Sequence, residues 1–143
     1  MTIHQISVFL ENRAGQLADI TAILSENRVD LRAINIAETA DYGVLRLIVD
    51  DAQRASAVLL ERGFILTMTP VVAVAVPDRP GGLSEVLQVI SRENIDVEYM
   101  YSVFGQKNGL AYMIFRVADN AAATAALAQR GIHIVEQEEI DKL

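Results

Sequence analysis

Apolar and polar positions follow two alternating periods along the chain, and the whole pattern occurs twice. Short β-branched runs at residues 3–10 and 71–76 each end in a polar loop that contains glycine, which is typical of the end of a strand. Apolar residues then recur every three or four positions, which predicts a helix with one apolar stripe in each copy. The stripes are formed by Leu17, Ile20, Ile23 and Leu24 in the first copy and by Leu83, Val86, Val89 and Ile90 in the second.

The remainder of each copy predicts a hairpin, a second helix and a last strand. Two β-branched segments joined by a turn rich in Asp, Asn and Gly predict the hairpin. An alanine-rich segment that opens on aspartate and stops at glycine predicts the helix. These elements cover residues 30–38, 43–50, 51–62 and a strand from Phe64 in the first copy, and residues 96–104, 109–117, 119–130 and a strand from Ile132 in the second.

The two copies are related by a direct sequence repeat. A shift of 66 positions places residues 12–17 (Asn-Arg-Ala-Gly-Gln-Leu) over residues 78–83 (Asp-Arg-Pro-Gly-Gly-Leu), and it also places Gly43 over Gly109. An internal repeat of this length indicates two domains with one fold. The expected domains are residues 1–69 and residues 70–143.

Each copy has the element order β-α-β-β-α-β. Because β-α-β crossovers are right-handed, both helices of a copy are expected to lie on one face of the sheet. The sequence therefore predicts the α+β fold class, with two ferredoxin-like βαββαβ sandwiches in one chain.

Composition excludes several classes of partner and site. The 143 residues are 52% hydrophobic and carry 12 basic against 19 acidic side chains, a net charge of −7 that repels a phosphate backbone. Because the sequence contains no cysteine, disulfides, thiolate catalysis and thiolate metal sites are excluded. The longest conspicuous apolar run, residues 71–76, is far shorter than the roughly 20 residues of a membrane helix. We expect a cytoplasmic protein with no nucleic-acid or membrane partner.

The duplicated start of the first helix resembles the ACT domain. The resemblance rests on a Gly-x-Leu motif preceded by Asn-Arg-Ala in the first copy and Asp-Arg-Pro in the second, and on the Val-Asp-Leu and Ile-Asp-Val entries into the next strand. It covers nearly the whole chain, twice, and is similar to stand-alone tandem ACT proteins without an enzyme module. It implies a regulatory protein that binds an amino acid at the seam between ACT units. The first copy departs from the family pattern, with Asn12 in place of an acidic residue and Ala14 in place of proline.

The loop before each of these helices has the chemistry to hold a zwitterion. Backbone amides in the first helical turn lack partners within the helix, and the helix dipole attracts a carboxylate there. Glycines allow the backbone to approach a ligand closely. Oxygens for the ammonium group are expected from Asn12, Asp78 and carbonyls of the second strand. The candidate ligand-binding residues are Asn12, Arg13, Ala14, Gly15, Gln16, Leu17, Asn35 and Ile36 in the first copy, and Asp78, Arg79, Pro80, Gly81, Gly82, Leu83, Tyr101 and Ser102 in the second.

Purely structural roles also fit many of these residues. A helix capped by Asn12 or Asp78 explains the loops without a ligand. His4 and His133 match no histidine in the other copy, and neither has the spacing of a catalytic triad or a metal site. The acidic tail at residues 136–139 is expected to be a solvated edge strand. Aromatic residues concentrate in the second copy, where we expect sheet packing or an interface; they are Tyr99, Tyr101, Phe104, Tyr112 and Phe115.

Three functions compete for this pattern. The first is a regulatory protein in which a free amino acid, as effector, alters a surface read by a regulated enzyme or other protein. The second is an interaction module whose paired sheets build a dimer without a ligand. The third is an acylphosphatase-type hydrolase, for which Arg13 and Arg79 are present but a run of phosphate-binding glycines is not. The sequence favours the first: a homodimer and not an enzyme, with no catalytic residues, no metal and no cofactor.

Overall fold

The computed structural model describes residues 2–11, 13–38 and 41–143, and the chain divides into two compact units. The N-terminal unit comprises His4–Thr69 and Ile140–Leu143, and the C-terminal unit comprises Pro70–Glu139 together with residues 2–3. The division after Thr69 lies between the two copies of the sequence repeat, so each unit consists mainly of one copy together with a short terminal segment of the other.

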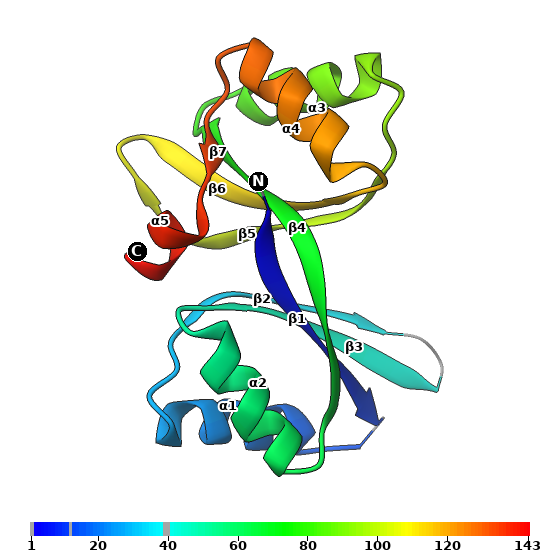
Figure 1. Ribbon diagram of the computed structural model, residues 1–143, viewed down its shortest axis with the longest axis vertical. Coiled ribbons are helices and arrows are strands. Elements are labelled where there is room, and N and C mark those ends of the chain that lie inside the picture. Colours follow the sequence, from blue (N-terminus) through cyan, green and yellow to red (C-terminus); the bar gives the residue numbers. More distant parts are fainter. Residues whose placement is uncertain (1, 12, 39–40) are drawn as a thin grey trace. The chain divides into compact units, whose positions relative to one another are not determined.

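The N-terminal unit has two helices on one face of a four-stranded sheet (Figure 1). The strands follow the hydrogen-bonded order β2-β3-β1-β4, and the β2·β3 and β1·β3 pairs are antiparallel. This order confirms the predicted ferredoxin-like arrangement. The elements are β1 (Ile3–Glu11), α1 (Gln16–Glu26), β2 (Leu31–Glu38), β3 (Tyr42–Val49), α2 (Ala52–Glu61) and the first part of β4 (Ile65–Pro77).

The core of the N-terminal unit lies between these two helices and the sheet. Alternate residues of a strand face the same side, so every second residue of β1 and β3 meets the apolar stripe of α1. Burial of this apolar surface is the main stabilising term for the unit. The central members are Ile6, Val8, Ile20, Leu24, Leu45, Leu47 and Leu59, all at most 1% exposed.

The C-terminal unit repeats the same arrangement with the strand order β5-β6-β4-β7, again with both helices on one face (Figure 1). Its core centres on Phe115, which is fully buried in a cluster with Val74, Val86, Ile90 and Leu127. The elements are the second part of β4, α3 (Gly82–Arg92), β5 (Val97–Lys107), β6 (Leu110–Val117), α4 (Asn120–Gln129), β7 (Ile134–Val135) and α5 (Gln137–Asp141).

The predicted aspartate caps begin α2 and α4. The Asp51 carboxylate accepts a hydrogen bond from the Arg54 amide, and the Asp119 carboxylate accepts one from the Ala122 amide, each at 3.0 Å. Each bond satisfies an amide that has no partner inside the helix. The predicted bounds of both helices hold to within one residue at each end because the caps and stops are local signals.

The strand expected from Phe64 and the strand expected at residues 71–76 are parts of one strand. β4 continues without interruption from Ile65 to Pro77 and is shared by the two copies. The Pro70 carbonyl accepts hydrogen bonds from Arg116 Nη1 at 3.0 Å and Asn120 Nδ2 at 3.2 Å. These side chains thus bind the backbone of β4 at a proline, which lacks an amide hydrogen and which sheets tolerate only in special positions.

The prediction of an edge strand in the acidic tail is wrong, since Gln137–Asp141 form the short helix α5. Glu139 holds the start of this helix: its carboxylate accepts a hydrogen bond from the Glu136 amide at 2.7 Å and contacts His133 Nε2 at 2.8 Å. Burial alone would raise the pKa of Glu139, but these two interactions, together with the positive charges of His133 and Lys107, outweigh it and the pKa lies below its ordinary value. His133 therefore has a structural partner, in accord with its predicted structural role.

Candidate functional site

The two helices that follow the first strand of each copy begin in the same way. Gly15 precedes α1 with φ 86° and ψ −12°, and Gly81 precedes α3 with φ 87° and ψ −10°. This left-handed conformation favours glycine, which has no Cβ to clash. Because Gly15 and Gly81 have no side chain, neither makes a side-chain cap hydrogen bond to its helix. The positive end of the helix dipole favours a carboxylate at such a helix start.

In the N-terminal unit, the loop before α1 borders a hollow, here called hollow A, of about 140 Å³. Four of the predicted ligand residues line it: Arg13, Gln16 and Leu17 from the loop and helix start, and Ile36 from β2. The structure thus brings the loop and the second strand of one copy to the same place. The full lining of hollow A is Leu10, Glu11, Arg13, Gln16, Leu17, Ile36, Glu38, Tyr42 and Gly43.

The other predicted residues of this loop take different positions. Ala14 and Gly15 form the exposed turn before α1. The Asn35 side chain accepts a hydrogen bond from Arg46 Nη1 at 3.0 Å, and neither residue lines hollow A. Asn12 lies outside the described residues, so its proposed contact with an ammonium group stays a prediction.

A second hollow, here called hollow B, of about 270 Å³ adjoins hollow A. The two share Leu10, Glu11, Gln16 and Tyr42. Hollow B has a largely apolar and aromatic wall, in which the Phe9 and Tyr42 rings lie 6.3 Å apart. Its full lining is Phe9, Leu10, Glu11, Gln16, Asp41, Tyr42, Gly63, Phe64 and Ile65.

Gln16 lines both hollows and contains an unusual atom. Its side chain is buried, with 7% of the residue exposed, yet its Oε1 atom has no hydrogen-bond partner in the described part of the chain. Buried polar atoms are nearly always paired, because an unpaired one has lost its bonds to water without replacement. A bound group that donates a hydrogen bond would supply the missing partner.

Charge around hollow A is predominantly negative. Glu11 and Glu38 contribute carboxylates, and Arg13 contributes one guanidinium whose Nε lies 3.6 Å from Glu11 Oε2. Both members of this ion pair are mostly exposed, and such pairs are weak, so each group is available to a ligand. The arrangement offers acceptors to an ammonium group and, at Arg13 and the start of α1, donors to a carboxylate.

The corresponding loop of the C-terminal unit is closed. Gly82 occupies the position of Gln16, and a Cβ at Gly82 would lie 2.0 Å from the Pro77 carbonyl oxygen. The Gly82 amide donates to the Arg79 carbonyl at 3.0 Å, and Arg79 Nη2 donates to both carboxylate oxygens of Glu85 at 3.0 and 3.1 Å. Strand end and helix start are thus packed together where the N-terminal unit has hollow A.

The remaining predicted residues of this copy have structural surroundings. The Asp78 amide donates to the Gly109 carbonyl at 2.9 Å, and Leu83 packs on the core cluster. Tyr101 is buried and its ring stacks on Tyr99, with ring centres 6.4 Å apart. The three others are exposed: Pro80, Gly81 and Ser102.

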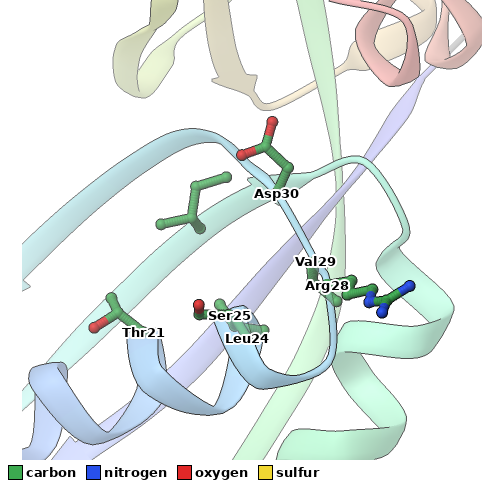
Figure 2. A pocket seen from close by; sticks show the side chains of 7 residues that line it. Thr21, Leu24, Ser25, Arg28, Val29 and Asp30 are labelled. Atoms are coloured by element: carbon green, nitrogen blue, oxygen red, sulfur yellow. The ribbon is translucent and has the colours of Figure 1, made fainter.

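A different pair of hollows occurs once in each unit, at the far end of the first helix. Figure 2 shows the one in the N-terminal unit, where Thr21, Leu24 and Ser25 come from α1 and Asp30 precedes β2. The turn between them contains Arg28, whose φ of 57° matches the 55° of Asn94 in the other unit. Each residue lining the second hollow lies 66 positions after its counterpart in the first: Thr21, Leu24, Ser25, Arg28, Val29, Asp30 and Leu31 correspond to Leu87, Ile90, Ser91, Asn94, Ile95, Asp96 and Val97.

These paired hollows follow from the turn that both copies share. No described residue places an unpartnered buried polar atom in either of them.

Within the described ranges, no three histidine, aspartate or glutamate side chains gather as metal ligands. In the same part of the chain, no helix has the length and apolarity to cross a membrane. The loop before α1 is therefore the best candidate site.

Sequence reasoning missed the strand residues that complete this site. Glu11 pairs with Tyr42 across β1 and β3, and Gly43 pairs with both Leu10 and Glu38. Strand register brings these residues beside the loop, and the repeat alone does not reveal that register. The usable signal was the hairpin glycine, because Gly43 pairs with both Leu10 at the end of β1 and Glu38 at the end of β2.

Comparison with known proteins agrees with the fold. The sequence matches the family described as an ACT domain pair over residues 1–143. The chain belongs to this family. A Bacteroides thetaiotaomicron protein of known structure is 34% identical to this ACT pair with a TM-score of 0.93, and the match covers 100% of this chain and 98% of that chain. No match was found among curated proteins.

Two more distant structures share the fold of this ACT pair. The ligand-free regulatory subunit of aspartate kinase from Thermus thermophilus is 18% identical with a TM-score of 0.61, covering 88% of this chain and 91% of that chain. The regulatory subunit of aspartate kinase from Thermus flavus is 17% identical with a TM-score of 0.56, covering 88% and 90%. At these identities the likeness shows the fold alone.

Proposed function

We propose that this ACT pair is a regulatory protein that binds a free amino acid at the junction of β1 and α1. The observation that carries the proposal is hollow A, which places the uncapped start of α1 beside carboxylates and a guanidinium. A zwitterion matches this arrangement better than a phosphate does, because two carboxylates would repel a phosphate.

The two ends of the ligand have separate partners in this proposal. The ligand carboxylate binds the first-turn amides of α1 and the guanidinium of Arg13, and it gains from the positive end of the helix dipole. The ammonium group faces Glu38 and Glu11 across hollow A. We also propose, as the resemblance implies, that the bound ligand lies at a seam between ACT units.

The ligand acts as a signal in this account and is not a substrate. Binding favours the conformation or assembly state that makes the contacts, and a partner protein reads the altered surface. The two structures from Thermus are described as regulatory subunits of an enzyme, which supports a regulated enzyme as the partner. We further propose a homodimer, since β2 at the edge of its sheet leaves backbone groups for pairing. A cytoplasmic location is a separate part of the proposal.

The structure offers little to a hydrolase of the acylphosphatase type. Arg79, which would bind a phosphoryl group, instead donates through Nη2 to both carboxylate oxygens of Glu85. Arg13 lies beside Glu11, and Glu38 also lines hollow A, so two carboxylates there would repel the same group. A ligand-free interaction module remains the competing function, and the following experiment separates it from the proposal.

Dialysed protein is expected to unfold at a higher temperature in the presence of one amino acid or a few related ones. A ligand at about 100 times its dissociation constant adds about 2.7 kcal/mol to the free energy of unfolding, which raises Tm by several degrees. The measurement is a thermal-unfolding screen of the twenty amino acids at millimolar concentration. A screen in which none of them changes Tm contradicts the proposal and favours the interaction module.

A further inference from the structure

We propose that the ligand is an amino acid with a large apolar side chain, that it binds only at the N-terminal unit, and that Gln16 recognises its ammonium group. This inference rests on the proposed function and specifies it. Three observations carry it: the unpartnered oxygen of Gln16, the apolar wall of hollow B, and the closed loop of the C-terminal unit.

The unpartnered atom determines which ligand group it meets. Gln16 Oε1 is an acceptor, so its missing partner is a donor. Of the two charged groups of an amino acid, only the ammonium donates. Glu11 shares both hollows with Gln16, and Glu38 lines hollow A, so their carboxylates favour a cation at the same place. The ammonium group therefore lies at the Gln16 side chain, and the carboxylate lies at the backbone amides of the first turn of α1.

Hollow B determines the class of side chain. It adjoins hollow A at Gln16 and has about twice its volume, 270 against 140 Å³. Phe9, Tyr42 and Ile65 on its wall are 45%, 48% and 69% exposed, which is high for large apolar side chains. A ligand side chain that covered them would remove apolar surface from water on both sides, and this is favourable. Leucine, isoleucine, methionine and phenylalanine have such side chains.

The C-terminal unit has no equivalent of the Gln16 side chain. Its residue at the position of Gln16 is Gly82, which has no amide side chain and lies against the Pro77 carbonyl. Arg79 Nη2 lies 3.0 Å from Glu85 Oε1, whereas Arg13 Nε lies 3.6 Å from Glu11 Oε2, so Arg79 makes the closer pair. We therefore expect one ligand molecule to bind per chain at these loops.

The test combines a variant with a modified ligand. Gln16→Met keeps the approximate shape of the side chain and removes its acceptor, and 3-phenylpropanoate is phenylalanine without the ammonium group. Calorimetric titration of the full chain is expected to give one site per chain for L-phenylalanine or L-leucine, at least tenfold tighter than for L-alanine. Gln16→Met is expected to weaken phenylalanine binding at least tenfold and to lose most of the preference for phenylalanine over 3-phenylpropanoate.

A control variant and a second measurement distinguish a loss of ligand recognition from a folding defect. Gln53→Met makes the same chemical change on the exposed face of α2 and is expected to bind like the wild type. Without ligand, Gln16→Met is expected to have a Tm equal to or above that of the wild type, since the unpartnered oxygen is gone.

The possible failures are distinct. If no amino acid binds at all, the proposed function itself is wrong. If only small or polar amino acids bind, if two bind per chain at these loops, or if Gln16→Met binds phenylalanine like the wild type, the proposed function stands and the present inference is overturned.

Discussion

Gly82→Ala is expected to destabilise the C-terminal unit by about 3 kcal/mol, near the upper end of the usual cost of overpacking. The added Cβ would lie 2.0 Å from the Pro77 carbonyl oxygen, which belongs to the backbone and has no rotamer to change. Either α3 or the end of β4 must move, and both elements pack on the core around Phe115. Urea unfolding monitored by circular dichroism measures the change.

The repeat supplies a matched control for this prediction. Gln16 occupies the equivalent position of the N-terminal unit, where the backbone already accommodates a Cβ. Gln16→Ala loses some packing but also removes the unpartnered oxygen, so its free energy of unfolding is expected to stay within about 1 kcal/mol of the wild type. Equal losses for Gly82→Ala and Gln16→Ala would show that the two loops do not differ as described.

Phe115→Ala is expected to have the largest effect on stability, a loss of about 3–5 kcal/mol. Phe115 on β6 is fully buried, and its truncation leaves a cavity among Val74, Val86 and Ile90 in addition to the lost transfer free energy. The measurement is the free energy of unfolding from urea denaturation, followed by a fluorescent probe of exposed apolar surface.

The control for this variant is an exposed phenylalanine of the same unit. Phe104 on β5 is 56% exposed, and Phe104→Ala is expected to change the free energy of unfolding by no more than about 0.5 kcal/mol. If Phe115→Ala cost as little as Phe104→Ala, the core would not lie where the structure places it. If Phe104→Ala cost several kcal/mol, Phe104 would be covered by a partner in solution.

Much of the fold was predictable because its signals are local or repeated. The apolar stripe of α1, the aspartate caps at Asp51 and Asp119 and the glycines before α1 and α3 are readable within a few residues. The repeat then tests each prediction a second time. What was missed depends on tertiary context: β4 runs through Pro70 because Arg116 and Asn120 bind its carbonyl, and the acidic tail is helical partly because Glu139 accepts from the Glu136 amide.

The candidate site was predictable in part. The sequence placed Arg13, Gln16, Leu17 and Ile36 at a ligand, and all four line one hollow. It treated Gly82 as a glycine that lets the backbone approach a ligand, whereas the structure uses it to let α3 approach Pro77. Both uses have the same sequence signal, because each requires only the absence of a Cβ. The distinction needs the strand position, which no local pattern gives.

The most direct test of the account is to find where an amino acid acts on the chain. Heteronuclear NMR spectra of the full-length protein, recorded during titration with L-phenylalanine, report every backbone amide separately. We expect the amide signals of Gly15, Gln16 and Leu17 to shift in a saturable manner, while those of Gly81 and Gly82 stay in place. Saturable shifts at Gly81 and Gly82 with none at Gly15 and Gln16 would contradict the account.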